Sequence, residues 1–297
     1  MNSKTIGLLV IGLATFATAP IVVRLAGQGA DPIAITTIRT VLASLLLLPI
    51  WWWHKEGRRS TPETAKHTWT WSALAGLFLS AHFALWVMSL GHTSVASASV
   101  LVTSHPVLLI LIESILMGVV FRRLTWIGVG IAFSGSVMLA LTDQSATATY
   151  SNPMLGNALA FAAALMFVGY ILISQKIRRH HTWLDYVTRV YLTTAIATVT
   201  LFFLLGKSTA AFTPGVLFSG ILLALGAQLI GHGALNYAVK SISPTLLSTL
   251  ILAEPVFATV LAVFIFSEIP SGWAAVAMGL TLTGILVSWW GRRNDVS

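Results

Sequence analysis

Cysteine is absent from the 297 residues, and charged side chains make up only 9% of them. The lack of cysteine excludes disulfides, thiol catalysis, iron–sulfur clusters and cysteine-bound zinc. A soluble domain usually carries about 25% charged residues, so the scarcity of charge argues against a soluble enzyme, a secreted domain or a peripheral membrane binder. Apolar residues account for 56% of the chain instead. This composition predicts an integral membrane protein.

The apolar residues fall into ten runs, and a bilayer-spanning helix needs roughly 20 such residues. Unpaired backbone groups are too costly in hydrocarbon for an open structure, and the runs do not alternate as barrel strands do. We therefore predict an all-α polytopic membrane protein with ten transmembrane helices. The predicted spans are residues 6–26, 33–53, 69–90, 95–119, 124–141, 155–174, 186–205, 215–238, 245–267 and 272–290.

Lysine and arginine gather on one side of the membrane when the ten spans are threaded from a cytoplasmic N-terminus. That side then holds thirteen cations, and the outer side holds two, Lys207 and Arg24. Such an excess marks cytoplasmic loops, so we predict cytoplasmic N- and C-termini in a bacterial cytoplasmic (inner) membrane. The net charge of +8 then reflects topology and no nucleic-acid partner. The thirteen cations are Lys4, Lys55, Arg58, Arg59, Lys66, Arg122, Arg123, Lys176, Arg178, Arg179, Lys240, Arg292 and Arg293.

The start of the chain has a second interpretation. Lys4, an apolar stretch and Ala17-Thr18-Ala19 resemble a cleavable signal peptide, which would place the N-terminus on the same side. The internal repeat gives the first span a counterpart in the sixth, which favours its retention.

Two halves of the sequence can be overlaid. A shift of 150 residues places His82–Trp86 on His232–Asn236 and Arg39 on Arg189. Because five spans is an odd number, the second repeat enters the membrane from the opposite side, and such inverted repeats suit alternating access. We therefore predict two inverted five-helix repeats at residues 1–150 and 151–297. A shift of 149 residues adds Ser94, His105-Pro106, Gly130 and Gly135, which fall on Ser243, Glu254-Pro255, Gly279 and Gly284.

This arrangement resembles the drug/metabolite transporter (DMT) superfamily, EamA type, over nearly the whole chain. Family members often carry an acidic residue between the fourth and fifth helices, where this chain has Phe121-Arg122-Arg123, so that the feature survives only as Glu268. The resemblance implies a secondary transporter, commonly an exporter of amino acids or related metabolites. It is carried by Ser94–Ser99, Pro106 and Gly130/Gly135, and by Ser243-Pro244, Glu254-Pro255, Phe266–Glu268 and Gly279/Gly284.

Ionisable residues inside the spans cost about 2.5–3.5 kcal/mol each on insertion scales, so each needs a reason. Arg39 and Arg189 are candidates to bind a substrate carboxylate, because a guanidinium stays charged and donates in a planar fork. The alternative is a structural pairing with helix-end carbonyls or with a partner such as Asp185.

Polar and aromatic residues form matching stripes on the third and eighth spans. His82 and Trp86 share one helix face because they lie four residues apart, and Gln228, His232 and Asn236 form the equivalent stripe. We expect these stripes to line a substrate cavity or an interhelical contact. Tyr237 is a further candidate in the cavity, as a gate near the cytoplasmic end.

His105 and Glu254 each precede a proline, which opens the helix and loosens the turn. A titratable group beside such a break is a candidate for proton coupling, and Glu113 in the fourth span is a third candidate. The alternatives are a kink capped by the polar side chain, and for Glu113 a pairing with an arginine.

No enzyme signature competes with transport. The chain has no P-loop glycine pattern and no hydrolase nucleophile motif, and His180 and His181 lie among cations, where a metal site is poor. We expect no enzyme activity, catalytic residue, metal or cofactor. The expected partners are a small-molecule substrate, the lipid bilayer and the proton as a candidate coupling ion, with the protein a monomer or homodimer.

The sequence therefore favours a secondary transporter that exports a small, amino-acid-like metabolite by alternating access. One alternative is an exporter of cationic drugs or amines, with Glu254 and Trp86 as an anionic and aromatic trap. The other is a non-transporting membrane sensor or assembly protein, against which the lack of a sizeable extramembrane segment argues.

The threading makes a direct prediction, since the native chain has no cysteine to interfere with labelling. Ser60→Cys should react with an impermeant maleimide only from the cytoplasm, and Ser145→Cys only from outside. The measurement is labelling in intact cells and in inverted vesicles. The reverse pattern at either position would refute the proposed topology.

Overall fold

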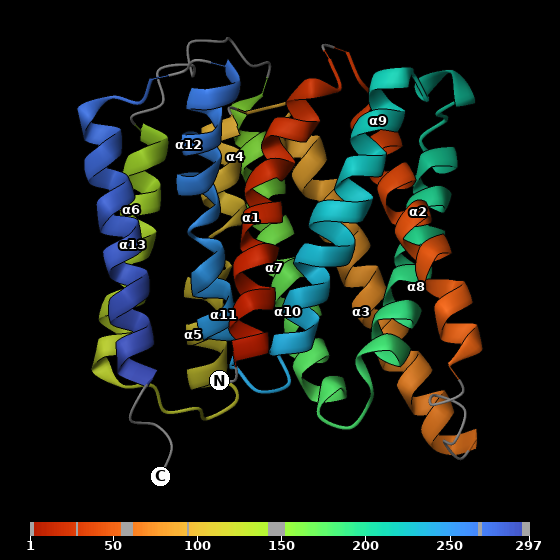
Figure 1. Ribbon diagram of the computed structural model, residues 1–297, viewed down its shortest axis with the longest axis horizontal. Helices are drawn as coiled ribbons and strands as arrows, with labels where there is room; N and C mark the ends of the chain where they lie inside the picture. Colours follow the sequence, from red (N-terminus) through yellow and green to blue (C-terminus); the bar gives the residue numbers. More distant parts are fainter. Residues whose placement is uncertain are drawn as a thin grey trace. The chain divides into compact units, whose positions relative to one another are not determined.

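The computed structural model describes residues 3–27, 29–54, 62–93, 95–141, 152–266 and 269–292, and these are almost entirely helical (Figure 1). Its helices are α1 (Ser3–Leu25), α2 (Pro32–Trp53), α3 (Pro62–Ser89), α4 (Val95–Val102), α5 (His105–Ile115), α6 (Arg123–Leu141), α7 (Pro153–Arg178), α8 (Trp183–Leu204), η3 (Thr209–Ala211), α9 (Pro214–Leu223), η4 (Ala224–His232), α10 (Gly233–Ala238), α11 (Pro244–Ile251), α12 (Glu254–Phe266) and α13 (Gly272–Arg292). The following residues discussed above lie outside the described ranges: Ser60, Ser94, Ser145, Glu268, Lys55, Arg58, Arg59 and Arg293.

The all-helical, membrane-spanning fold is confirmed. Among the described residues, nine helical segments are long and apolar enough to cross a bilayer, and Arg123–Leu139 is a shorter apolar helix at the place of the fifth predicted span. Three predicted spans are interrupted. The fourth is divided into α4 and α5, the ninth into α11 and α12, and the eighth contains a π-helical stretch, η4.

Local sequence explains where several helices begin. The Asp31 side chain accepts hydrogen bonds from the backbone N–H groups of Ile33 and Ala34, and Pro32 occupies the first turn, where its missing N–H costs nothing. Ser243 and Pro244 start α11 in the same way. At α5 and α12 a proline follows His105 and Glu254 in the first turn, so each proline begins a new helix after a break.

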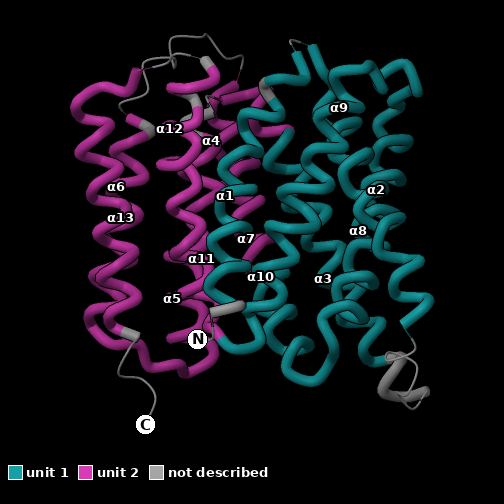
Figure 2. Tube along the Cα trace, viewed as in Figure 1, with its two compact units in different colours: residues 1–87, 169–241 teal, residues 88–168, 242–297 magenta. Residues whose placement is uncertain are grey.

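The chain forms two compact units, coloured separately in Figure 2. Unit 1 comprises residues 1–87 and 169–241, and unit 2 comprises residues 88–168 and 242–297. Each unit combines segments from both predicted repeats. The repeats at 1–150 and 151–297 describe sequence relatedness, which is a different division from packing, and they stay a prediction.

In unit 1, α2 and α8 run antiparallel along their length. Lys207, after the end of α8, forms an ion pair of 2.6 Å with Asp31 at the start of α2. At the opposite ends, the Trp51 indole N–H donates to Asp185 at 3.0 Å. Between them, the hydroxyls of Thr40 and Thr198 lie 2.7 Å apart. Polar contacts thus hold this pair at both ends and in the middle.

Unit 2 contains a close antiparallel pair, α6 and α13. A Cβ atom on Gly128 would lie 2.2 Å from the backbone N of Ser288, and one on Gly284 would lie 2.2 Å from that of Ala132. Small residues let membrane helices approach closely, which supplies packing energy where no hydrophobic drive exists between helices and lipid. Beside this pair, Leu252 and Ala253 at the α11–α12 break pack against Ala132.

Repeat-related spans pair in both units. The second and seventh spans pair as α2 with α8, and the fifth and tenth as α6 with α13. The fourth and ninth spans pair through α5 and α11. In all three pairs, residues early in one helix contact residues late in the other, which is the orientation that an inverted repeat requires.

The glycine contact in unit 2 yields a stability prediction. Gly284→Ala should lower the melting temperature in detergent strongly, because overpacking costs about 1–3 kcal/mol and here the neighbour is backbone. Gly279→Ala in the same helix is the matched control, since nothing lies within 4 Å of a Cβ there. Equal melting temperatures for the two variants would contradict the close packing of α6 and α13.

Candidate functional site

Arg39 and Gln228 meet inside unit 1. Arg39 lies in α2 with 4% of its surface exposed, and Gln228 lies fully buried in η4. The Arg39 Nε–H donates to Gln228 Oε1 at 2.7 Å. The guanidinium carbon also lies 4.0 Å from the centre of the Phe83 ring, a cation–π contact with α3. One buried cation is thereby held by two other helices.

Gln228 belongs to the π-helical stretch Ala224–His232, which also carries His232. Stretches of this kind are rare and occur often at functional sites, because the wider turn changes which residues share a face. Gly231 makes the neighbouring approach of α1 possible, since a Cβ there would lie only 3.0 Å from the Phe16 ring. The Tyr191 hydroxyl donates to the Gln228 carbonyl at 2.7 Å and holds the stretch against α8.

Aromatic rings surround His232. Its ring lies edge-on to Phe16 and to Phe83, with centroids 5.0 and 5.2 Å away, and Tyr170 lies 5.9 Å away. We call Phe16, Arg39, Phe83, Gln228 and His232 the Arg39 cluster. It joins a cation and an amide to a largely aromatic wall.

Asn236 lies two turns beyond Gln228, at the end of the same span. Its amide Nδ2 donates to the Tyr170 hydroxyl and to the His232 carbonyl, the latter at 2.9 Å. The backbone carbonyl of Asn236 accepts a hydrogen bond from Arg178 Nε at 2.9 Å. Trp183 Nε1 donates to the nearby backbone carbonyl of Gly233 at 2.8 Å. Arg178 and Trp183 thus satisfy carbonyls at the end of this span.

Two buried amide atoms of this stripe have no hydrogen-bond partner among the residues that the structure describes. They are Gln228 Nε2, a donor, and Asn236 Oδ1, an acceptor. The Gln228 assignment follows from chemistry, because Arg39 Nε is a donor and therefore requires the oxygen of the amide to face it. The amide nitrogen then points elsewhere. An unsatisfied buried polar atom costs about 1–3 kcal/mol, and a ligand is one means of satisfying it.

Three further residues of the predicted cavity are His82, Trp86 and Tyr237. His82 is 9% exposed, and its ring lies 5.4 Å from that of Phe83 in a tilted arrangement. Trp86 and Tyr237 are half-buried, in α3 and α10. Their roles in substrate binding and gating stay predictions.

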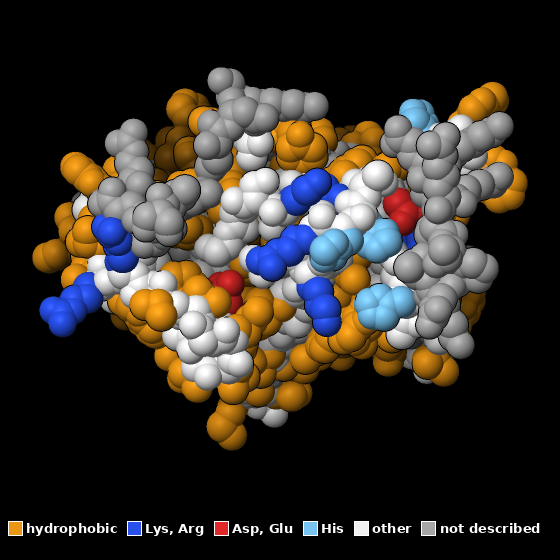
Figure 3. Space-filling view, turned by 90° about the horizontal axis from the view of Figure 1, so that it is seen from below, with side chains coloured by type: hydrophobic (Ala, Val, Ile, Leu, Met, Phe, Trp, Pro, Cys, Tyr) orange, Lys and Arg blue, Asp and Glu red, His pale blue; other side chains and the backbone are white. Residues whose placement is uncertain are grey.

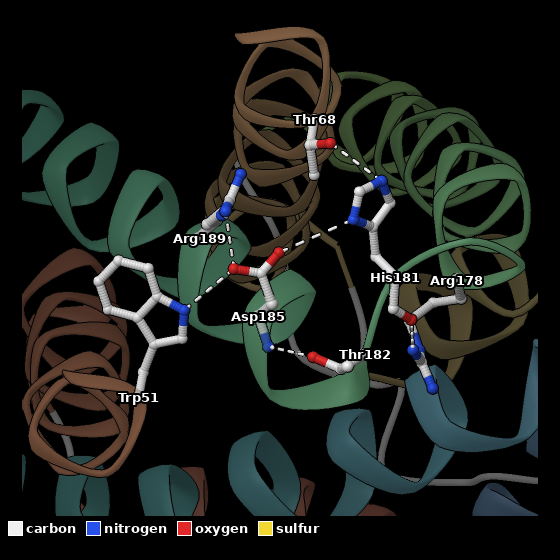
Figure 4. Close-up of polar contacts among 7 residues, drawn as sticks. All are labelled: Trp51, Thr68, Arg178, His181, Thr182, Asp185 and Arg189. Atoms are coloured by element: carbon white, nitrogen blue, oxygen red, sulfur yellow. Dashed lines mark hydrogen bonds and ion pairs between the residues drawn. The ribbon is translucent and has the colours of Figure 1, made fainter. Parts of the chain in front are cut away.

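Arg189 has a partner in its own helix. Its Nη2 forms a 2.7 Å ion pair with Asp185, four residues earlier in α8, and its guanidinium lies 4.9 Å from the Trp69 ring centre. Figure 4 shows that Asp185 is shared, because Trp51 donates to the same carboxylate and His181 approaches it from the α7–α8 loop. We call Trp51, Thr68, His181, Asp185 and Arg189 the Asp185 cluster. The ion pair between Arg189 and Asp185 is the structural alternative to carboxylate binding that the sequence offers for Arg189.

In unit 2, the coupling candidates in the fourth span contact α11. Glu113 is 2% exposed, and its carboxylate accepts hydrogen bonds from the backbone N–H of Thr245, at 3.0 Å, and from the Thr245 hydroxyl. Glu113 therefore satisfies donors at the first turn of α11. Its described partners include no arginine. His105 shares a hydrogen bond with Ser248 and stacks on Phe167 with ring centroids 4.4 Å apart. Glu254 is half-buried at the start of α12.

The sequence alone does not identify several residues of the site. Phe16, Phe83, Tyr170 and Tyr191 are apolar or aromatic members of apolar spans, so nothing in the sequence separates them from packing residues. Arg178 counts toward the cytoplasmic charge, yet it is 4% exposed and binds carbonyls. A signal for it exists, because a cation in the last turn of a helix favours contact with carbonyls.

A family model agrees with this architecture. The model of the EamA-like transporter family matches residues 3–141 and 154–290. The chain belongs to this family. EamA-like proteins form part of the drug/metabolite transporter superfamily, so the protein is a transporter.

Two relatives of this EamA-like transporter carry the same general description. The uncharacterized transporter YwfM of Bacillus subtilis (strain 168) is 26% identical over 294 residues, or 97% of this chain and 94% of the relative. An uncharacterized transporter of Archaeoglobus fulgidus is 22% identical over 292 residues, or 97% and 98% of the two chains. A crystal structure with 20% sequence identity covers 99% of this transporter and 100% of that chain, with a TM-score of 0.80. That likeness shows a shared fold.

The buried ion pair of the transporter yields a prediction. Arg189→Gln should lower the melting temperature markedly, because breaking one side of a buried pair typically costs about 3–5 kcal/mol. Asp185→Asn should also destabilise, and the double variant should lose much less than the sum. Thermal unfolding of the three variants measures the coupling. The control is Arg179→Gln, which changes an exposed arginine in the loop between α7 and α8. Additive losses would show that the pair does not act as a unit.

Proposed function

We propose that this EamA-like transporter exports a small, amino-acid-like solute by alternating access, and that the solute's carboxylate binds Arg39 and Gln228. The observation that carries the proposal is the buried Arg39–Gln228 hydrogen bond, in which the amide oxygen is used and the amide donor is left without an acceptor among the described residues. A carboxylate offers two acceptor oxygens, which suits one guanidinium and one amide donor side by side.

The aromatic part of the Arg39 cluster supports an organic solute. Phe16, Phe83 and the His232 ring present apolar and edge surfaces beside the cation. Small-molecule sites are typically lined by such side chains, with a few polar groups that fix orientation. An inorganic anion would gain nothing from this wall. A metabolite with a carboxylate and an apolar or aromatic side chain uses both parts.

The cationic-drug alternative receives less support. Among the described residues of unit 1, the Arg39 cluster contains a cation and no carboxylate, so a positively charged ligand would be repelled there. Glu254, which that alternative needs, belongs to unit 2. The sensor alternative has no supporting observation, because the family and both relatives are described as transporters.

The proposed mechanism and location rest on topology, whereas export is what the family resemblance implies. The two family matches are of nearly equal length, and repeat-related helices pair antiparallel, both of which support inverted repeats. Inverted repeats suit alternating access. The excess of lysine and arginine supports cytoplasmic termini in the inner membrane.

The test is transport in proteoliposomes by single-residue variants. Arg39→Gln should lower uptake efficiency for an amino acid such as phenylalanine by about 30-fold or more, because losing one partner of a buried charge contact costs about 2–5 kcal/mol. Gln228→Leu should lower it by about tenfold, the value of a hydrogen bond. Phenethylamine, which lacks the carboxylate, should not lose transport with either change, and Arg39→Gln should if anything raise it, because the substitution removes a cation that repels the amine.

Ser44→Ala is the matched control, because Ser44 is buried in the same helix and its hydroxyl has no partner among the described residues. Wild-type phenylalanine transport in folded Arg39→Gln protein would refute the carboxylate site. An equal fall for phenylalanine and phenethylamine would assign Arg39 a conformational role instead.

A further inference from the structure

His181 connects two helices of unit 1 through its ring. Its Nε2 lies 2.9 Å from the Thr68 hydroxyl on α3, and its Nδ1 lies 3.9 Å from the Asp185 carboxylate on α8. The first is a hydrogen bond, and the second is too long for one. The loop backbone is fixed as well, because Arg178 Nη1 donates to the His181 carbonyl (Figure 4). A single side chain thus joins α3 to the α7–α8 loop.

This ring is half-buried, and its side chain is 23% exposed. The residue lies between two candidate spans, Pro153–Arg178 and Trp183–Leu204, and so belongs to the end of the bundle. Figure 3 looks onto this end and shows histidine, lysine and arginine side chains among apolar ones. A proton from the adjoining water can therefore reach His181.

The charges that face His181 come from three elements. Asp185 and Arg189 lie on α8, His67 lies on α3, and His180 lies in the same loop. The pKa of His181 is lowered from its ordinary value, first because burial disfavours the charged ring, and further by Arg189, His180 and His67; Asp185 opposes this. Burial and the neighbouring cations therefore make this contact less favourable for the charged ring than for the neutral one.

We propose that His181 is a proton-binding site that releases α3 from the α7–α8 loop when it is protonated. The closed contact stabilises the neutral ring. Protonated His181 would be a second cation beside Arg189. Asp185 is already paired with Arg189 at 2.7 Å, so it cannot neutralise both. A protonated ring can still donate from Nε2 to the Thr68 hydroxyl, so it is the excess of positive charge beside Arg189 and the lost hydration that favour an arrangement in which the ring is hydrated and the Thr68 contact is broken.

The direction of the pH effect follows from linkage. A histidine whose pKa is lower in the closed contact than in water stabilises that contact at pH values above its ordinary value of about 6.5, and the stabilisation is lost as the pH falls below it. Acid on this side of the membrane opens this end of unit 1. The site is independent of the carboxylate site proposed above, and its test needs no substrate.

The experiment measures opening by labelling a single cysteine. Ser72→Cys places it one turn after Thr68 in α3, at a fully buried position. N-ethylmaleimide labelling of purified protein is compared at pH 8.0 and pH 5.0 with and without His181→Gln, which retains a hydrogen bond to Thr68 and cannot titrate. At each pH, the labelling rate with His181 present is divided by the rate with His181→Gln, which cancels the effect of pH on ionisation of the thiol. This ratio should rise severalfold from pH 8.0 to pH 5.0, toward about tenfold per unit of pKa difference between the two arrangements.

Two further variants keep the result decisive. His180→Gln changes an exposed histidine of the same loop and should keep the pH response. Thr68→Val removes the partner on α3 and should label rapidly at pH 8.0 already. A pH-independent ratio, a response abolished by His180→Gln, or slow labelling of Thr68→Val at pH 8.0 would each overturn the assignment.

Discussion

A guanidinium inside a bilayer-spanning helix cannot lose its charge, and unit 1 is organised around the partners of two such groups. Arg189 and Asp185 form an ion pair within one turn of α8, and the Asp185 carboxylate also accepts a hydrogen bond from Trp51 on α2. Arg39 is held by an amide from η4 and a ring from α3. Because each cation needs groups from other helices, these contacts fix how the helices of the unit pack.

The two arginines occupy repeat-related positions, yet their surroundings have diverged. The residue that corresponds to Asp185 in the first repeat is Ile35, so Arg39 has no carboxylate one turn before it. Gln228 corresponds to Phe78, so the amide that binds Arg39 has no counterpart either. Arg189 forms an ion pair inside its own helix, while Arg39 donates to a neutral amide across the unit. That difference favours a structural role for Arg189 and a ligand-binding role for Arg39.

The sequence predicts the spans well because hydrocarbon imposes a simple rule on them, and charged or proline-bearing breaks mark their ends. It also predicts the breaks before Pro106 and Pro255. It does not reveal the π-helical stretch, since Gln228 and His232 fit an ordinary helical face as well. Nor does it reveal that Glu113 binds the first turn of α11, because that contact joins residues 132 positions apart. Contacts between distant segments depend on packing, which periodicity does not encode.

The antiparallel pairing of α2 and α8 gives the predicted repeat a physical meaning. When α2 and α8 run in opposite directions, a residue near the start of one lies beside the end of the other, as Asp31 with Lys207 and Trp51 with Asp185 show. Related sequences then supply different contacts at the two ends of one pair. One end is held by the partly exposed ion pair of Asp31 and Lys207, and the other by the buried pair of Asp185 and Arg189, to which His181 adds a titratable contact. Solvent screens the partly exposed pair more than the buried pair of Asp185 and Arg189, so an added charge acts more strongly at the Asp185 end. Two helices related by the predicted repeat can therefore carry a titratable contact at one end of their pair and a plain ion pair at the other.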